Sequence, residues 1–326
     1  MAALPPRVSV LIATYNDAPF LGAAIDSVLA QTFTDFELVV VDDASTDGSR
    51  EIVERYRDRR IRLVVNAENL GAGPARNRGL ATIASECVAH LDGDDVCFPQ
   101  RLARQVAYLD AHPECAVVGA QATLIDIAGR NKGEVRRPVT ELGIRWWRVF
   151  GSPLIHSSAM VRRAIVWDEL GGYEERFRFG EDFDLWYRLA KTHAIHNLPE
   201  TLVAYRFDPR SITATERGGY AARKLPKILD NMREILQWDD APRQPVECWL
   251  ELSADNARDA VDLIERCDAR FTSLYGDSDE IAERTAELFV RALRKAPSFR
   301  LMLKIWRRHR KTALRTLLRA ARRATV

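Results

Sequence analysis

Three carboxylates around one glycine end an apolar run near residue 90. The run Val88–Leu91 is followed by Asp92, Gly93, Asp94 and Asp95, which we call the acidic turn. Like charges a few ångströms apart raise one another's pKa, so this turn is costly without a cation. A divalent metal ion is the simplest remedy, because Mg²⁺ or Mn²⁺ takes one or two carboxylates together with phosphate oxygens. A merely acidic surface turn is the alternative that these residues alone leave open.

Polar side chains also follow two earlier apolar runs. They are Thr14, Tyr15 and Asn16 after Val8–Ala13, and Asp42 and Asp43 after Phe36–Val41. Both runs are nearly all apolar and rich in β-branched residues, which is typical of strands buried on both faces of a parallel sheet. Ligands of such sheets bind beyond the carboxyl ends of the strands. We therefore expect these polar groups and the acidic turn to lie at one edge.

Strands and helices alternate along this part of the chain. In order we predict a strand at Val8–Ala13, a helix with apolar spacing from Phe20 to Leu29, a strand at Phe36–Val41, a helix ending near Arg57, a strand at Ile61–Val65, a helix at Pro74–Ser85 and a strand at Cys87–Leu91. This order predicts βαβ units with right-handed crossovers. A dinucleotide-binding domain is disfavoured, because no GxGxxG pattern follows the first strand.

The second half of the chain is mixed and then helical. We predict strands at Ala116–Ile125 and Ser157–Arg162, an amphipathic segment around Trp146, and helical spacing over Ala222–Gln237, Val246–Leu274 and Ser278–Lys295. The predicted domains are an α/β domain at 1–216, a helical region at 217–298 and a basic helix at 299–326. The fold class is α/β, with a Rossmann-like mixed, mostly parallel sheet flanked by helices.

Composition describes a globular protein with a sizeable core. The 326 residues are 47% hydrophobic, and no stretch approaches the ~18 apolar residues of a membrane span. The five cysteines are odd in number and include no CxxC pair, which favours a reducing compartment. Met1–Arg7 contains no basic segment followed by an apolar run, so we expect no classical export signal. These features predict a cytoplasmic protein.

The net charge of +2 is unevenly distributed. From Leu288 to the end there are 13 Lys or Arg and no acidic residue, which leaves 35 basic and 46 acidic residues elsewhere. A helical projection of 299–326 separates apolar residues, including Trp306, from a basic face. Such a helix is typical of membrane-surface binding, so we predict that 299–326 contacts an anionic membrane surface on the inner face of the cell membrane. Packing against its own domain or a partner chain is the alternative, and a homodimer stays open. The acidic remainder argues against nucleic acid.

A set of motifs in fixed order then points to one family. They are Val8–Asn16, Gln31–Phe33, Val41–Asp47, Asn69–Gly71, Ala75–Asn77, Leu91–Asp95 and Gly180–Asp182. Over roughly its first 210 residues the chain resembles the family 2 glycosyltransferases of the GT-A fold. The resemblance implies a nucleotide-sugar donor, with a UDP-sugar favoured, a divalent Mn²⁺ or Mg²⁺ ion, and transfer with inversion at the anomeric carbon.

The resemblance implies that 1–216 is the catalytic domain, with 1–115 as its nucleotide side and 116–216 as its acceptor side. It also assigns roles on the donor side. It implies that Asp94 is the direct metal ligand and that Asp92 faces the ribose or the metal through water. Asp43 would accept from the ring N–H of a pyrimidine, and Tyr15 would stack on its face. The full nucleotide-binding set is Thr14, Tyr15, Asn16, Asp43, Arg76 and Asp92. Helix capping by Asp43 and core packing of Tyr15 are the alternatives.

On the acceptor side the resemblance points to the start of a helix. Asp182 corresponds to the family's general base, which takes the proton of the attacking hydroxyl. Glu181 would hydrogen-bond acceptor hydroxyls, whereas Asp184 is structural. The alternative is that these acids only complement the dipole at a helix N-terminus. The acceptor is expected to be a saccharide or a lipid-linked glycan.

Asp208, His156 and Asp95 lie outside these donor and acceptor assignments. Many relatives carry a metal-site histidine where this chain has Asp208; the resemblance makes Asp208 a third candidate metal ligand, and the alternative is that this position has left the metal shell. We expect His156 to be a buried histidine with satisfied hydrogen bonds, with contact to the acceptor as the alternative. Asp95 is assigned a structural role as a cap of the helix that begins near Pro99.

The sequence therefore predicts a metal-dependent inverting glycosyltransferase. Two alternatives stay open at this point. A nucleotidyltransferase shares the architecture and the metal requirement, but the glycine- and basic-rich loop that it needs after the first strand is missing. A non-catalytic nucleotide-sugar-binding or scaffold subunit of a glycan-assembly complex is the alternative from another class, and the departure at Asp208 keeps it open.

Overall fold

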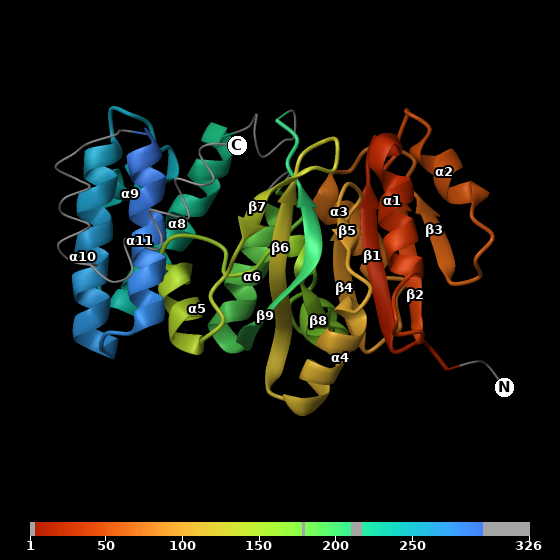
Figure 1. Ribbon diagram of the computed structural model, residues 1–326, viewed down its shortest axis with the longest axis horizontal. Helices are drawn as coiled ribbons and strands as arrows, with labels where there is room; N and C mark the ends of the chain where they lie inside the picture. The colour runs from red at the N-terminus through yellow and green to blue at the C-terminus, as the bar shows by residue number, and fades with distance from the viewer. Residues whose placement is uncertain (1–3, 178–179, 210–216, 296–326) are drawn as a thin grey trace. The chain divides into compact units, whose positions relative to one another are not determined.

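The structure is a computed structural model that describes residues 4–177, 180–209 and 217–295 (Figure 1). The chain divides into two compact units. The first comprises Met1–Val139 with Leu154–Ser211, and the second comprises Thr140–Pro153 with Ile212–Val326. Every residue that the sequence assigned to donor binding or catalysis belongs to the first unit.

The first unit is built on a sheet that has nine strands in the described part of the chain. They are β1 (Val8–Thr14), β2 (Phe36–Asp42), β3 (Ile61–Val65), β4 (Cys87–Asp92), β5 (Val96–Cys97), β6 (Cys115–Ile125), β7 (Asn131–Val135), β8 (Met160–Arg162) and β9 (Ala194–Arg206). Their order is β3-β2-β1-β4-β8-β6-β9-β5, with β7 paired to β6. The first four strands in this order run parallel, as do β6 and β9, whereas β5, β7 and β8 pair antiparallel. The predicted α/β fold with a mixed sheet is confirmed.

Helices cover both faces of the parallel part of the sheet (Figure 1). They are α1 (Ala18–Leu29), α2 (Ser49–Arg55), α3 (Ala72–Leu80), α4 (Arg101–Ala111) and α6 (Glu181–Thr192). Buried residues of α1 and α4 share one core cluster with Val10 and Val40, while α3 packs on the opposite face of β1 and β2. A Cβ at Gly79 of α3 would lie 2.4 Å from Leu11 Cδ1, so glycine allows this close approach.

Two predicted boundaries in the first unit were wrong. The third helix, predicted at Pro74–Ser85, is α3 and ends at Leu80. The strand predicted at Ser157–Arg162 begins instead with a 3₁₀ turn, η1 (His156–Ser158), and only Met160–Arg162 is extended. The hydroxyl of Ser158 donates to Ile155 O at 2.8 Å and closes that turn, an option that apolar spacing does not reveal. A π-helix, η2 (Ala164–Glu169), follows β8.

The second unit is helical. It contains α5 (Glu141–Arg148), α8 (Arg217–Leu236), α9 (Arg243–Leu250), α10 (Ala257–Tyr275) and α11 (Asp279–Lys295). The continuous helical spacing predicted over Val246–Leu274 is wrong, because α9 and α10 are separate. Pro242 and Pro245 lie at the start of α9, where proline is tolerated, and the interruption falls at 251–256. The predicted domain ends at 216 and 298, and the basic segment 299–326, lie outside the described residues.

Candidate active site

Polar residues from three strand ends meet at one edge of the sheet. In the parallel register Thr14 lies opposite Asp42, and Ala13 lies opposite Asp92. The backbone N–H of Asp43 donates to Thr14 O at 2.9 Å. The sequence predicted this convergence, since the carboxyl ends of parallel strands share an edge.

Tyr15 and Asn16 form the turn after β1. The side chain of Tyr15 is 47% exposed, so it is not a core residue and its ring face is accessible. Asn16 has φ 59°, a left-handed conformation that asparagine tolerates. Its Oδ1 accepts from Thr46 N at 2.8 Å, and its N–H donates to Ser45 Oγ at 3.0 Å. Asn16 therefore ties the turn after β1 to the turn after β2.

The carboxylate of Asp43 is held by a single loop. It accepts from Asn66 Nδ2 at 2.7 Å, from Leu70 N at 3.1 Å and from Gly71 N at 2.9 Å. A carboxylate offers about four acceptor positions, so these donors leave little capacity for a nucleobase N–H. Asp43 therefore positions residues 66–71 beside the strand ends, and its contact with a base stays a prediction. Sequence reasoning missed Asn66, which has no motif of its own.

Three carboxylates crowd the edge: Asp17, Asp92 and Asp94. Burial, reinforced by the charges of Asp92 and Asp17, raises the pKa of Asp94 to about 7. Burial is also the main reason why the pKa of Asp17 is raised to about 6, with Asp92 adding to it. A Cβ at Gly93 would lie 2.6 Å from Asp17 Oδ2, so the glycine lets the two segments approach. Sequence reasoning missed Asp17, although its place just beyond the end of β1 is a usable signal.

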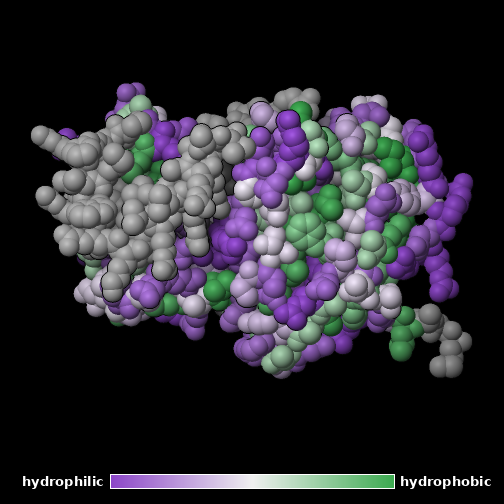
Figure 2. Space-filling view, viewed as in Figure 1, coloured by the Kyte–Doolittle hydropathy of each residue, from purple (hydrophilic) through white to green (hydrophobic). Residues whose placement is uncertain are grey.

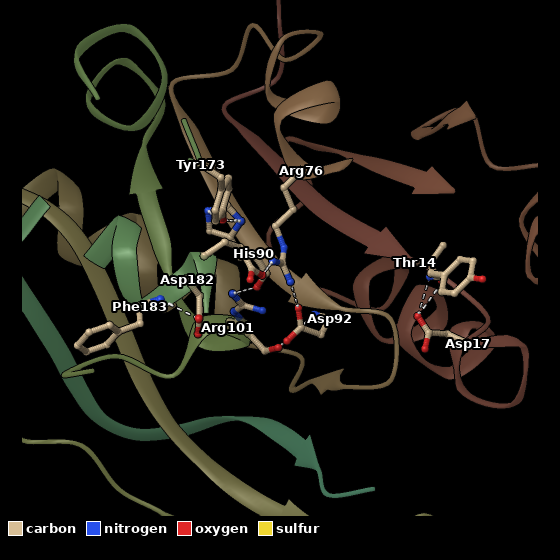
Figure 3. Close-up of polar contacts among 12 residues, drawn as sticks. Thr14, Asp17, Arg76, His90, Asp92, Arg101, Tyr173, Asp182 and Phe183 are labelled. Atoms are coloured by element: carbon tan, nitrogen blue, oxygen red, sulfur yellow. Dashed lines mark hydrogen bonds and ion pairs between the residues drawn. The ribbon is translucent and has the colours of Figure 1, made fainter. Parts of the chain in front are cut away.

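Arg76 of α3 joins the acidic turn to α6 (Figure 3). Its Nη2 donates to Asp92 Oδ1 at 2.7 Å, and its Nη1 donates to Glu181 Oε1 at 2.5 Å. Burial alone would lower the pKa of Arg76, but the carboxylates of Asp92 and Glu181 raise it above its usual value. The guanidinium carbon also lies 5.6 Å from the ring centroid of Tyr173. The structure thus joins two residues that the sequence assigned to nucleotide binding, Arg76 and Asp92, to Glu181, which it assigned to the acceptor side.

We expect Arg76→Ala to destabilise the protein strongly. Removing the guanidinium leaves Glu181 and Asp92 as neighbouring carboxylates without their cation, and breaking a buried ion pair typically costs about 3–5 kcal/mol. The measurement is the free energy of unfolding in urea. Arg78→Ala is the matched control, because Arg78 lies on the same helix but is exposed. Equal stability losses in the two variants would contradict the importance of this bridge.

Asp182 occupies the first turn of α6. Gly180 precedes the helix with φ 73°, a left-handed conformation that glycine adopts without strain. The half-buried carboxylate of Asp182 accepts from Phe183 N through Oδ1 at 2.7 Å (Figure 3). Asp184 pairs with Arg188 at 2.8 Å, and Arg188 also donates to backbone carbonyls before and within the loop that precedes α6. Asp184 therefore has the structural contacts expected of it.

Two buried histidines stack next to the Arg76 bridge. The rings of His90 and His156 are 4.8 Å apart, and Tyr173 and Trp186 pack around them. Burial lowers the pKa of both imidazoles well below its usual value, so both are neutral. Neither ring nitrogen of His156 has a hydrogen-bond partner in the described part of the chain. The expectation of a satisfied histidine was therefore wrong.

Asp95 has a structural contact that differs from the predicted one. Its Oδ1 accepts from Arg206 N at 2.7 Å. Helix α4 begins only at Arg101, with Gln100 as its N-cap residue, so the predicted capping by Asp95 is wrong. Arg206 is the last residue of β9, which brings the segment leading to Asp208 to the end of the sheet that carries the acidic turn.

The charges at this edge suit a cation that is shared with a diphosphate. No three His, Cys, Asp or Glu side chains within 4–177, 180–209 and 217–295 are arranged to hold a metal ion together. Arg76 is already divided between Asp92 and Glu181, and the raised pKa values of Asp94 and Asp17 show that a further cation would stabilise their charged forms. Mg²⁺ and Mn²⁺ commonly bind one or two carboxylates with phosphate oxygens completing the shell. The carboxylate oxygens at this edge fit such an ion, with Asp94 as the candidate ligand.

Comparison with known proteins gives this site its context. The family described as glycosyl transferase family 2 matches residues 9–170. The putative glycosyltransferase EpsE of Bacillus subtilis is 36% identical over 209 residues, which cover 62% of this chain and 74% of EpsE. The amylovoran biosynthesis glycosyltransferase AmsE of Erwinia amylovora is 32% identical over 203 residues, which cover 61% and 75%. This chain belongs to glycosyl transferase family 2. It is a glycosyltransferase, as its sequence predicted.

Solved structures place this glycosyltransferase in the GT-A fold. Staphylococcus aureus TarS 1-349 in complex with UDP-GlcNAc matches with a TM-score of 0.58 and 19% identity, over 94% of this chain and 90% of that one. The mannosyltransferase PcManGT of Pyrobaculum calidifontis, in complex with GDP-Man and Mn²⁺, matches with a TM-score of 0.56 and 21% identity, over 98% and 87%. At these identities the likeness concerns the fold.

The described helices bear on whether the chain could cross a membrane. In the described ranges, no helix has the length and apolar character required to cross a bilayer. The visible face of the first unit carries interspersed hydrophilic and hydrophobic residues (Figure 2). All five cysteines are buried free thiols. The predicted contact of 299–326 with a membrane stays a prediction.

Proposed function

We propose that this glycosyltransferase moves a sugar from a nucleoside diphosphate donor to a hydroxyl of a saccharide or lipid-linked glycan, with inversion at the anomeric carbon. The observation that carries the proposal is the Arg76 bridge. It ties Asp92 of the acidic turn directly to Glu181, the neighbour of Asp182. One guanidinium therefore fixes Asp92, on the donor side, relative to Glu181, which precedes the candidate base.

The donor would lie along the edge where β1, β2 and β4 end. The exposed ring of Tyr15 would stack on the base, while the loop 66–71, held by Asp43, would form the wall beside it. Thr14 and Asn16 would shape the turn beneath the nucleotide, and Arg76 and Asp92 would face the ribose and phosphates. We assign Glu181 a positioning role, because its carboxylate is committed to Arg76.

Asp182 would act as the general base. Oδ1 accepts from Phe183 N, so Oδ2 is left to receive the proton of the acceptor hydroxyl. The helix N-terminus favours the ionised carboxylate that this step requires. The acceptor oxygen would then bond to the anomeric carbon on the face opposite the diphosphate, whose bond to that carbon breaks. One displacement of this kind inverts the configuration.

Asp94 would hold a divalent ion, with Asp92 near it. When bound, Mn²⁺ or Mg²⁺ supplies positive charge to the departing diphosphate. Asp208 stays a weaker candidate ligand, since it follows the strand that contacts the acidic turn. The chain itself places Asp94 among carboxylates whose mutual repulsion a cation would reduce.

We also propose a nucleobase for the sugar donor. We favour a UDP-sugar on the family resemblance, but one structural neighbour is described with UDP-GlcNAc and another with GDP-Man and Mn²⁺. A relative named for amylovoran biosynthesis supports a saccharide acceptor. The basic segment 299–326 would bring the site to an anionic membrane if the acceptor is lipid-linked.

A thermal-shift panel tests donor binding. We expect one of the UDP-, GDP- or dTDP-sugars to raise the melting temperature in Mn²⁺ but not in EDTA, because a ligand of the native state stabilises it by mass action. At 100 times its Kd such a ligand adds about 2.7 kcal/mol. No rise with any of them would contradict the proposed donor class. A rise without turnover across an acceptor panel would favour a non-catalytic binding subunit.

A further inference from the structure

Whereas Arg76 contacts the acidic turn at Asp92, Arg206, the last residue of β9, contacts it at Asp94 and Asp95. Its backbone N–H donates to Asp95 Oδ1 at 2.7 Å, and its Nε donates to the backbone O of Asp94, also at 2.7 Å. Its Nη1 donates to Asp126 O at 2.9 Å in the turn between β6 and β7. The guanidinium carbon lies 4.4 Å from the ring centroid of Phe20 in α1. Arg206 is 8% exposed, so these contacts are shielded from water.

The acidic turn is held in place by hydrogen bonds to other parts of the fold. At its start, Asp92 N donates to Ser157 Oγ at 3.1 Å. Within it, Asp95 N donates to Asp92 O at 3.1 Å. Gly93 adds no side-chain packing of its own and has the largest backbone freedom of any residue type. Arg206 therefore supplies the anchor at the far end, where Asp94 and Asp95 lie.

We propose that Arg206 is a positioning residue for Asp94, a role that rests on the proposed function of Asp94 as a metal ligand. Arg206 holds the carbonyl of the peptide that links Asp94 to Asp95. Because the direction of a side chain follows its backbone, this contact sets where the Asp94 carboxylate points. A ligand that is preorientated binds a metal ion and diphosphate more tightly, since less conformational freedom is lost on binding.

The chemistry of arginine is needed for this role. The planar guanidinium presents several N–H groups in fixed directions, which lets it serve two separate backbone carbonyls and lie over a ring at once. A lysine retains the charge but has a single ammonium that cannot reproduce the fork. We therefore expect Arg206→Lys to behave much more like Arg206→Gln than like the native protein in metal binding.

Arg162→Gln is the matched control. Arg162 is a mostly buried arginine of the same sheet that also donates to backbone carbonyls, through Nε to Cys115 O at 3.0 Å and through Nη2 to Leu109 O at 2.7 Å. Among the described residues its contacts are with Cys115, Leu109, His112 and Glu86, not with the acidic turn, so its loss should lower stability without altering metal affinity. The melting temperature of each full-length variant measures the stability effect.

The experiment titrates Mn²⁺ by electron paramagnetic resonance in the presence of UDP, or of GDP if GDP is the nucleotide that stabilises the native protein. We expect Arg206→Gln and Arg206→Lys to weaken Mn²⁺ binding about 10- to 100-fold, as is typical when a group supporting a metal ligand is removed. Arg162→Gln should keep the native affinity at a similar loss in melting temperature.

The outcomes separate this inference from the proposed function. If the native protein binds no Mn²⁺ with either nucleotide, the proposed metal-dependent donor site is wrong. If the native protein binds Mn²⁺ and folded Arg206→Gln binds it equally well, the metal site stands and the role of Arg206 is overturned. Equal weakening in Arg162→Gln would show a general effect of lost stability and would also overturn it.

Discussion

Asp94→Asn is expected to lower sugar transfer by about a thousandfold or more. The substitution keeps the size of the side chain but removes the charge that would bind a divalent ion. Charge stabilisation by such an ion is typically worth several kcal/mol in the transition state, and each 1.4 kcal/mol is about a factor of ten in rate. The measurement is the steady-state rate with saturating donor and Mn²⁺, with Mn²⁺-dependent nucleotide binding followed by calorimetry.

Asp17→Asn provides the control inside the same carboxylate cluster. It removes one negative charge from the edge, and its amide oxygen can still accept from Thr14 and Tyr15 as the Asp17 carboxylate does. We expect it to weaken Mn²⁺-dependent binding by less than about tenfold, because Asp17 is not the assigned ligand and would act on the ion only as a neighbouring charge at longer range. Equal losses for Asp17→Asn and Asp94→Asn would indicate that the field of the cluster, and not ligation by Asp94, controls the metal.

Asp182→Asn is expected to abolish most transfer while leaving the donor bound. General base catalysis contributes about 10²- to 10⁴-fold, and asparagine cannot take the proton of the acceptor hydroxyl. The amide oxygen can keep the contact with Phe183 N, so the helix start should be preserved. Transfer rates with a working acceptor, together with nucleotide affinity by calorimetry, measure the two effects separately.

Asp184→Asn is the matched control on the same helix. It breaks the ion pair with Arg188 and should lower the free energy of unfolding, but folded protein should retain its transfer rate. Retention of more than a third of native transfer in Asp182→Asn would rule out Asp182 as the base. A matching loss of nucleotide affinity would instead assign Asp182 to the donor side.

The sequence predicted the parallel part of the sheet well because the signal there is strong. Val8–Ala13 and Phe36–Val41 are nearly all apolar, which is typical of strands buried on both faces of a parallel sheet, and the polar residues that follow them were therefore expected to meet at one edge. Errors arose where local spacing carried less information. The hydroxyl of Ser158 closes a 3₁₀ turn, and the prolines near Val246 start a helix that the spacing had joined to the next one.

The sequence predicted candidate site residues but not the contacts between them. Asp43, Arg76 and Glu181 stood in recognisable motifs, yet each was assigned a direct role toward a substrate. In the structure Asp43 holds the loop 66–71, and Arg76 is shared between Asp92 and Glu181. Such pairings depend on which helix packs beside which strand, and Arg76 and Glu181 are 105 positions apart in the chain.

Residue types and strand-end positions in the sequence were enough to predict the fold class, the family and the edge at which the polar strand ends meet, since hydrophobic patterning and motif order can be read from the chain alone. The partners of each charge followed from three-dimensional packing alone. Asp17 lies close to Gly93, and Arg206 donates to the peptide carbonyl of Asp94, because the fold brings together segments that are far apart in the sequence. The burial that raises the pKa of Asp94 likewise exists only once those segments enclose it.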